Sequence, residues 1–503
     1  MTSANTELEA MRAENAQLRA QIATLLTKVA RLTDQVSELL VIAQRKRRGA
    51  ERPPKAPEPT PDLPEEAATA FEGRPTLPEP VEKPKPEPKP RKPTGRKPLP
   101  EHLPADTSVL TPEACSCCSG RNLEIVDEVV EEKLTVVAAH QRRRVVHRKT
   151  ARCRDCLGRT TAEAPPAPFE RSKVTCDWLA WLFVQKFVLL VPLDRIRRYL
   201  GAQGVVLSIS FYVSQIEALA ELFDAVDGEH WRQLLIGDML ASDATGLKVL
   251  IPKLGAHHGH IEVYHWDGLV VFQYEAEKGG ETQQSKLARF RGTLLVDAES
   301  RYNATFRRED VIEAGCNAHG RRKFRDAEEV QPKLAAEGAR FISAMFESDD
   351  EARKQGLVGE ARRAWRQREI APLAATFRKW MEAVDPTLVP SDPLAKAIRY
   401  YRNHWDALMR FLEDPRLPLD NSASEREFQA VAKLRLNCLF AGGTEGAHRA
   451  AVLLGIAATC RRLGLDVQAY ATWALERLGT HRTKFALPVA QLTPAAYKHA
   501  LAR

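Results

Sequence analysis

The N-terminal segment shows a heptad pattern of apolar side chains. Apolar residues recur at alternating steps of three and four between Leu8 and Leu39. With Leu8 at heptad position a, most a positions are β-branched, most d positions are Leu, and Asn15 is the polar residue at a. This pattern favours a parallel two-stranded coiled coil over residues 6–43, in which Asn15 fixes the register. A single amphipathic helix packed on the protein body is the alternative.

Helical periodicity returns between residues 170 and 228. The apolar spacing predicts helices over residues 178–191, 193–200 and 211–223, and either Ser208 or Ser210 caps the last of them. Helix, turn and capped helix resemble a helix-turn-helix. Its middle helix carries three candidate DNA-contacting cations, which are Arg195, Arg197 and Arg198. A plain helical connector would give the same pattern, so both interpretations stay open.

From about Leu234 the pattern changes to that of β-strands. Three runs predict an antiparallel meander over residues 239–250, 261–266 and 269–274. The turns are expected at the His-Gly-His sequence around Gly259 and at Asp-Gly before Leu269.

A helix over residues 281–290 and short strands over 293–297 and 314–318 complete the predicted sheet. Three antiparallel strands, a helix and two further strands form the order of the α/β ribonuclease-H-like fold, in which the first and fourth strands are neighbours. We therefore expect Asp243 to lie beside Asp297, although 54 positions separate them.

Two carboxylates on adjacent strands repel each other unless a positive charge lies between them. Carboxylate oxygens suit Mg²⁺, so this pair predicts a magnesium site. We expect the third ligand, Glu425, near the start of a helix that residues 420–422 cap. The charged helical sequence at about 325–412 is then an insertion in a catalytic domain over residues 232–445. Residues 446–503 are expected to form a C-terminal helical region.

Two CxxC pairs indicate a metal site of a different kind. Thirty-four residues separate the pairs, and two such pairs complete the four-sulfur shell of a structural Zn²⁺. The predicted ligands are Cys115, Cys118, Cys153 and Cys156. Cys117 offers a competing ligand, and a redox CxxC is the less favoured alternative because no βαβ context surrounds the pairs. A zinc-binding domain with a basic strand is predicted over residues 109–165.

Composition adds a linker and a polyanionic partner to this picture. Of the 32 prolines among 503 residues, 17 lie between Pro53 and Pro104, interleaved with Lys, Arg and Glu. Residues 44–108 are therefore predicted to be a disordered, Pro-rich basic linker. The formal net charge of +8 is modest but favours an anionic partner such as DNA. No apolar run is long enough to span a membrane and no signal peptide is evident, which predicts a cytoplasmic protein.

Five short motifs from residue 241 onward combine acidic, basic and glycine residues. They are Ala241-Ser-Asp243-Ala-Thr-Gly-Leu-Lys-Val-Leu250, Gly315-Cys-Asn-Ala-His319-Gly-Arg-Arg-Lys-Phe324, Phe411-Leu-Glu-Asp414, Leu419-Asp-Asn-Ser-Ala-Ser-Glu-Arg426 and Leu439-Phe-Ala-Gly-Gly443. They resemble the motifs of the insertion sequence 66 family of bacterial transposases. The resemblance extends over nearly the whole chain, since that family also has a zipper-like N-terminal helix, a cysteine-paired zinc region and a helical C-terminal tail.

The resemblance implies a DNA transposase with an Asp-Asp-Glu (DDE) triad formed by Asp243, Asp297 and Glu425. In the implied mechanism, these carboxylates hold two Mg²⁺ ions and support cleavage at the element ends, then strand transfer into target DNA. The candidates for phosphate contacts or for orienting the carboxylates are His319, Arg321, Arg322 and Arg426. The expected partners are DNA, a second copy of the chain through the coiled coil, and small accessory proteins of the element. The expected location is the bacterial nucleoid.

The sequence departs from the family pattern at three places. The usual Asp-Glu-Thr is Asp-Ala-Thr starting at Asp243, the usual Asn-Asn-Ala-Ala-Glu is Asn-Ser-Ala-Ser-Glu ending at Glu425, and an Arg-Lys-Asn stretch is Arg-Leu-Asn starting at Arg435. All three carboxylates of the triad are retained despite these departures. A decayed transposase that binds element ends without cutting them, or a dimeric zinc-containing DNA-binding regulator, remains an alternative. A regulator has no evident use for two acids on apolar strands, because a buried unpaired carboxylate is costly.

Overall fold

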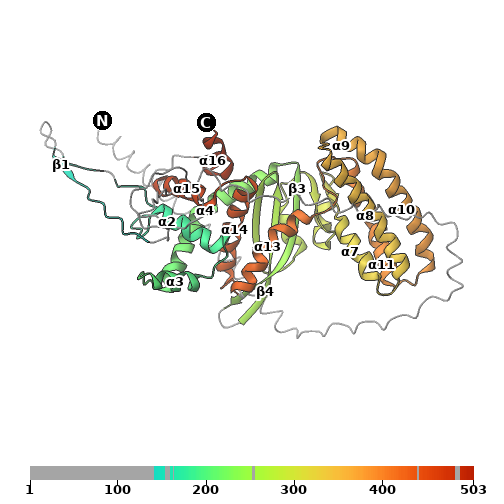
Figure 1. Cartoon of the computed structure of the whole chain (residues 1–503), viewed down its shortest axis with the longest axis horizontal. Coiled ribbons are helices and arrows are strands. Elements are labelled where there is room, and N and C mark those ends of the chain that lie inside the picture. The colour runs from blue at the N-terminus through green and yellow to red at the C-terminus, as the bar shows by residue number, and fades with distance from the viewer. Residues whose placement is uncertain are drawn as a thin grey trace, which may run out of the picture. The chain divides into compact units, whose positions relative to one another are not determined.

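The computed structural model describes residues 141–152, 159–162, 164–251, 255–438, 441–481 and 488–502 (Figure 1). The predicted coiled coil, the Pro-rich linker and the four predicted zinc ligands lie outside these residues. From Thr150 onward the described residues belong to one compact unit. Its first element is a small antiparallel ribbon of β1 (Thr150–Arg152) and β2 (Arg159–Thr161).

A five-stranded sheet forms the centre of this unit. Its strands are β3 (Met239–Ile251), β4 (Gly255–Trp266), β5 (Leu269–Glu275), β6 (Gly292–Leu295) and β7 (Val311–Ala314). The spatial order is β5-β4-β3-β6-β7, with an antiparallel meander of β3 to β5 and with β6 and β7 running parallel to β3. The predicted neighbourhood of the first and fourth strands is therefore confirmed, and the mixed α/β core fits an α/β nuclease-like fold.

The turns of the meander only partly follow the prediction. Asp267 and Gly268 form the predicted two-residue turn, and both have positive φ, at 44° and 85°. The predicted turn at Gly259 is wrong, because Gly259 lies inside β4 opposite Leu247. Its lack of a side chain has a packing reason instead: a Cβ there would lie 2.5 Å from the hydroxyl oxygen of Tyr274. Glycine thus makes room for a buried tyrosine ring on the neighbouring strand.

We expect Gly259→Ala to lower the free energy of unfolding by about 1–3 kcal/mol, since the added methyl overpacks a site filled by Tyr274. Gly246→Ala is the matched control. Gly246 lies on the adjacent strand β3, and a Cβ there would meet no heavy atom within 4 Å. Urea titration of both variants measures the difference. Equal stability of the two would contradict the packing reason.

Two further boundaries differ from the prediction. The helix expected over 281–290 is shorter in the structure, where it forms α5 (Gly280–Lys286). Beyond its end, the carbonyl oxygens of Leu287 and Phe290 accept hydrogen bonds from Arg308, both at 2.8 Å. The strand expected over 314–318 is β7, which ends at Ala314. Helix α7 (Asn317–Ala327) begins immediately afterwards, and the Asn317 amide nitrogen donates to the carbonyl oxygen of Leu408 at 2.8 Å.

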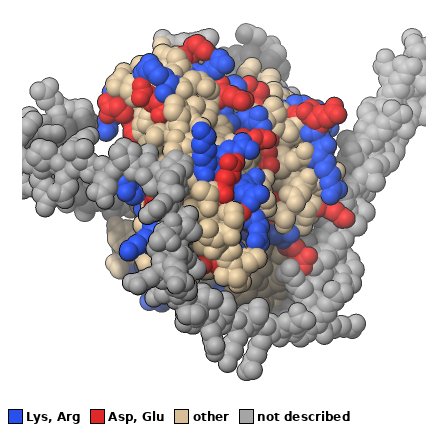
Figure 2. All heavy atoms as spheres, turned by 90° about the vertical axis from the view of Figure 1, so that its right-hand side faces the viewer, with Lys and Arg blue, Asp and Glu red and all other residues tan. Residues whose placement is uncertain are grey.

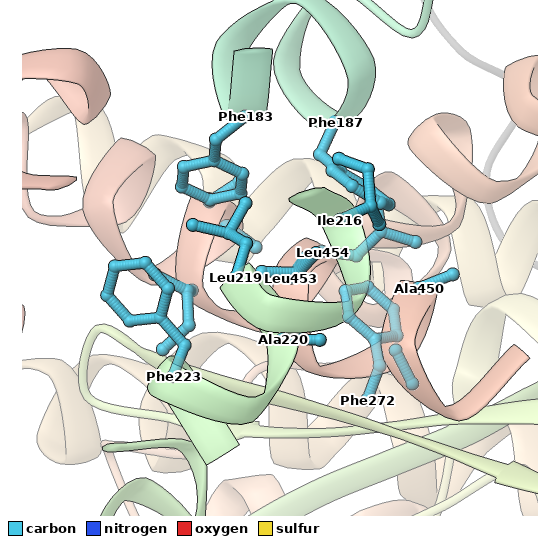
Figure 3. Packing of buried hydrophobic residues seen from close by; sticks show 14 of the residues in the cluster. Phe183, Phe187, Ile216, Leu219, Ala220, Phe223, Phe272, Ala450, Leu453 and Leu454 are labelled. Carbon is cyan, nitrogen blue, oxygen red and sulfur yellow. The ribbon is translucent and has the colours of Figure 1, made fainter. Parts of the chain in front are cut away.

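A group of helices packs on one face of the meander. These are α2 (Cys176–Phe183) with a π-helical turn (Val184–Val188), α3 (Leu193–Ala202), α4 (Ile209–Ile236), α14 (Thr444–Arg462), α15 (Val467–His481) and α16 (Pro494–Leu501), which follows a 3₁₀ turn (Val489–Leu492). Helices α4 and α14 pack against the strands, and the others lie behind them. Ser208 caps α4 by accepting from the backbone N–H of Phe211. Figure 3 shows Phe223 of α4 and Leu453 of α14 in the apolar layer that they share with Phe272 of the sheet. None of the described helices is long and apolar enough to cross a membrane.

A helical insertion follows β7 and α7. Its elements are α8 (Pro332–Lys354), α9 (Gly359–Trp365), a π-helical turn (Arg366–Ile370), α10 (Ala371–Val384) with a 3₁₀ turn (Asp385–Thr387), α11 (Pro393–Asn403) and α12 (Trp405–Met409) with a 3₁₀ turn (Arg410–Leu412). Phe324, Phe377 and Trp380 lie in its aromatic core. Buried Arg366 donates to Asp349 and to the carbonyl oxygen of Leu417. This contact fixes the segment that leads from the insertion back to α13 (Ser422–Cys438).

Candidate active site

The parallel pairing of β3 and β6 brings two acidic residues together. The register pairs Leu240 with Leu294 and Ala241 with Leu295. Asp243 and Asp297 each lie two positions beyond the last of these pairs, and the charge of Asp297 acts on Asp243. Burial raises the pKa of Asp243 to about 7, and the charges of Asp297 and Glu299 add to this shift. The backbone N–H of Ala244 donates to Asp243 Oδ1 at 2.7 Å and opposes it.

Asp297 follows the end of β6 and, like Asp243, is partly buried; its side chain is 13% exposed. Burial raises its pKa, with a further contribution from the charge of Glu299, while His319 and Arg301 oppose the shift. His319 Nε2 lies 3.9 Å from Asp297 Oδ2. Within the described part of the chain, Asp297 Oδ1 has no hydrogen-bond partner although it is buried. The site therefore holds two crowded carboxylates and an oxygen able to accept one more bond.

A buried ion-pair cluster lies beside this acidic pair. Glu262 is fully buried on β4, where it faces Ala244 of β3 in the strand register. Its carboxylate contacts Arg301 and lies 2.7 Å from Lys286 Nζ, and it accepts hydrogen bonds from Tyr264 and Gln283. Burial pushes the pKa of Glu262 upward, but Lys286 and Arg301 outweigh it and hold that pKa below its ordinary value.

The sequence reasoning missed this cluster. One signal in the sequence could have indicated it: Glu262 lies between two apolar residues, Ile261 and Val263, in a predicted strand. Arg301 links this cluster to the candidate site, because its positive charge lowers the pKa of both Asp243 and Asp297.

Glu425 stands on α13, and its side chain is 49% exposed. Arg322 Nη2 of α7 lies 3.4 Å from Glu425 Oε1. His319 and Arg322 are three residues apart on α7 and therefore share one face of that helix. Through this face α7 reaches both Asp297 and Glu425. Among the residues that the structure describes, however, no three His, Cys, Asp or Glu side chains are grouped so as to hold one metal ion.

The remaining predicted DNA-contacting residues are spread over three helices. Arg426 of α13 is exposed, whereas Arg321 of α7 is half-buried with its guanidinium 4.8 Å from the ring centroid of Phe346. On α3, Arg195 is exposed, and Arg197 and Arg198 both pair with Asp194. The following helix, α4, carries only acidic charges before Arg232.

Charges of both signs also mix on the helical insertion. Figure 2 shows Lys and Arg side chains interleaved with Asp and Glu over this face. Ion pairs such as Arg363–Glu360 and Arg378–Glu382 account for part of the pattern. This face is therefore not a uniformly basic path for DNA.

Comparison with known proteins identifies the family. The family described as "Transposase IS66 family" matches residues 171–449, which is more than half of the chain. The chain belongs to the IS66 transposase family. The matched segment contains the acidic pair, α7 and α13.

Relatives of this IS66 family member occur in Sinorhizobium fredii (strain NBRC 101917 / NGR234). The uncharacterized protein y4hP is 28% identical over 422 residues, covering 78% of this chain and 75% of that protein. The uncharacterized protein y4jD is 28% identical over 406 residues, covering 76% of this chain and 78% of that protein. Family membership supports a DNA-processing transposase and the use of a divalent metal.

Proposed function

We propose that the chain is a DDE transposase that catalyses metal-dependent cleavage and strand transfer of an insertion sequence on a ribonuclease-H-like core. The observation that carries this proposal is the placement of two partly buried carboxylates, Asp243 and Asp297, at neighbouring strands. Such a pair is unfavourable by itself, and it becomes favourable when a cation enters between the two carboxylates. A regulator that only binds DNA would have no need for this arrangement.

The donor chemistry fits Mg²⁺, because both aspartates offer hard carboxylate oxygens and the buried Asp297 Oδ1 has a free acceptor position in the described part of the chain. Asp243 and Asp297 would hold the metal. Glu425 would become the third ligand after its ion pair with Arg322 breaks. Bound Mg²⁺ supplies the Lewis acidity that stabilises the attacking and leaving oxygens of a phosphoryl transfer. His319, whose Nε2 lies 3.9 Å from Asp297 Oδ2, would help to orient that carboxylate once the two move into hydrogen-bond distance.

Arg322 and Arg426 are proposed to bind DNA phosphates beside the acidic pair. We expect Arg322→Ala and Arg426→Ala each to weaken binding to DNA of any sequence. The negative slope of log affinity against log salt concentration should become shallower by about one in each variant. Arg353→Ala is the control, because Arg353 is an exposed arginine of α8 that pairs with Asp350. Fluorescence anisotropy at several salt concentrations gives the slope. An unchanged slope in either variant would remove that residue from the DNA path.

The assay of the function itself uses the full-length chain and DNA carrying the element ends. We expect cleaved ends and strand-transfer products with Mg²⁺, and none when the metal is chelated. DNA binding without any product would favour the decayed transposase or the zinc-containing DNA-binding regulator. The flanking DNA gives an independent observation, because paired inverted repeats around the gene are expected for a transposase.

The remaining features of the proposal concern assembly. We propose that the coiled coil over residues 6–43 forms a homodimer or higher oligomer, and that the two CxxC pairs bind Zn²⁺. The helices around α3 would add DNA contacts to those of the catalytic core. Small accessory proteins of the element are proposed partners, and the nucleoid of the bacterial cytoplasm is the proposed location.

A further inference from the structure

A line of buried hydrogen bonds joins α13 to β3, β4 and α14. Arg462 Nη1 of α14 lies 3.2 Å from His265 Nδ1 of β4, and His265 Nε2 lies 2.9 Å from Ser424 Oγ of α13. Ser424 Oγ donates to Asn421 Oδ1 at 2.7 Å. Asn421 Nδ2 then donates to the carbonyl oxygen of Ser242 on β3 at 2.8 Å. The side chains of His265, Ser424 and Asn421 are all buried.

The direction of donation is the same along the whole line. Arginine can only donate, so His265 Nδ1 accepts and its Nε2 carries the proton that Ser424 Oγ accepts. The Ser424 hydroxyl is then free to donate to the amide oxygen of Asn421. Burial, with the charges of Arg462 and Arg426, lowers the pKa of His265 to about 3, which keeps the ring neutral as this pattern requires. The neutral tautomer of His265 with its proton on Nε2 is therefore the one that fits all the hydrogen bonds in the line.

The line connects the immediate neighbours of two predicted metal ligands. Ser242 precedes Asp243 on β3, and Ser424 precedes Glu425 on α13. Asn421, Ser424 and Glu427 are spaced by three, so they share one face of the helix start. Buried Glu427 extends the line, because it accepts a hydrogen bond from Arg462 at 2.9 Å and also pairs with Arg461.

Apolar packing holds only the later part of α13. Its buried apolar residues are Phe428, Val431 and Leu434, all beyond Glu425. Before Phe428 the buried side chains of this segment are polar. Apolar contacts are not directional, whereas hydrogen bonds fix distance and angle. The rotation and height of the first turn, which carries Glu425, are therefore set by the hydrogen-bonded line.

We propose that His265, Ser424 and Asn421 are positioning residues that hold Glu425 in place relative to Asp243. This inference rests on the proposed function, in which these two acids serve one metal site. None of the three touches the reacting atoms. They act through the helix start, and their loss displaces Glu425 without removing any ligand.

The test compares Ser424→Ala with Thr459→Val in the full-length chain. Thr459 is a buried residue of α14 whose hydroxyl bonds the backbone of Val270, outside the line. Both changes delete one buried hydroxyl. We expect Ser424→Ala to lower the rate of end cleavage and the affinity for Mn²⁺ about 10- to 100-fold, the usual effect of losing a residue that supports metal ligands. Thr459→Val should change neither, and DNA affinity should stay unchanged in both.

Two further measurements keep the test independent of activity. Amide hydrogen exchange of the metal-free chain should speed up at residues 422–427 in Ser424→Ala and stay unchanged at 431–438. His265→Leu should change Mn²⁺ affinity and amide exchange as Ser424→Ala does. His265→Gln keeps a hydrogen-bond donor, so its effect on both measurements should be smaller. Mn²⁺ binding at the acidic site is defined as the fraction of total Mn²⁺ binding that is lost in Asp243→Asn.

Equal results for Ser424→Ala and Thr459→Val in metal affinity and in exchange would overturn the positioning role. A wild-type chain that binds DNA but never cleaves it would overturn the proposed function instead. In that case the Mn²⁺ affinity and the exchange rates still decide between a positioning role and a purely structural one.

Discussion

Replacement of Asp243 or Asp297 by Asn is expected to abolish cleavage and strand transfer while leaving DNA binding intact. Each carboxylate is proposed to hold the metal whose charge stabilisation is worth several kcal/mol in the transition state, so the expected loss of rate is at least about a thousand-fold. Glu425→Gln should show a comparable loss. Product formation on element-end DNA in Mg²⁺ measures all three variants.

The same Asp243→Asn variant should be more stable than the wild type when no metal is present. The pKa of Asp243 rises from 3.8 to about 7 on folding, so the folded state binds the proton more tightly than the unfolded state does. Its favourable contribution is therefore present at low pH and is lost as pH rises from about 4 through about 7. Asparagine does not titrate, so the variant does not lose stability in this way as pH rises. The difference in free energy of unfolding between Asp243→Asn and wild type should be about 2 kcal/mol larger at pH 8 than at pH 5.5.

Asp238→Asn is the matched control for both effects. Asp238 lies just before β3, its side chain is 71% exposed, and it pairs with Arg416. This change should leave cleavage unaltered and stability within about 1 kcal/mol of wild type. Added Mg²⁺ should stabilise the wild type and Asp238→Asn but not Asp243→Asn, because only a folded metal site gains from binding. Wild-type cleavage in Asp243→Asn or Asp297→Asn would exclude that residue from the triad.

The sequence predicts most of the strands of the sheet because each strand depends on a local pattern. Short apolar stretches mark β3 and β5, and an apolar run that ends in Asp297 marks β6. Strand order then places Asp297 beside Asp243 without any knowledge of side-chain packing. Gly259 misleads the same reasoning, since a glycine that accommodates a tyrosine ring has the same appearance in a sequence as a glycine in a turn.

The supporting contacts depend on residues far apart in the chain. His265 and Ser424 are 159 positions apart, and Arg301 lies 39 positions after Glu262. No periodicity connects such residues, and each has an ordinary local role as a strand or helix residue. Asn421 and Ser424 stand beside Glu425 in the motif, yet only the structure shows that their side chains face β3 and β4 instead of solvent.

Removal of the buried guanidinium of Arg301 should strongly lower the free energy of unfolding. Arg301 and Glu262 are both almost fully buried and in contact, so Arg301→Met leaves the Glu262 carboxylate with Lys286 as its remaining cationic partner in the described cluster. Breaking a buried pair from one side costs about 3–5 kcal/mol. Lys278→Ala, which breaks the more exposed pair with Glu299, is the control and should cost no more than about 1 kcal/mol.

A double-mutant cycle separates the charge from the packing of Arg301. If the cost arises from an uncompensated carboxylate, Glu262→Gln should restore part of the stability that Arg301→Met removes. The acidic pair gives a second readout, because the charge of Arg301 lowers the pKa of Asp243 and Asp297. Arg301→Met should therefore raise both pKa values further and shift metal-dependent cleavage to higher pH. Additive losses in the double variant, with an unshifted pH profile, would reduce Arg301 to a packing residue.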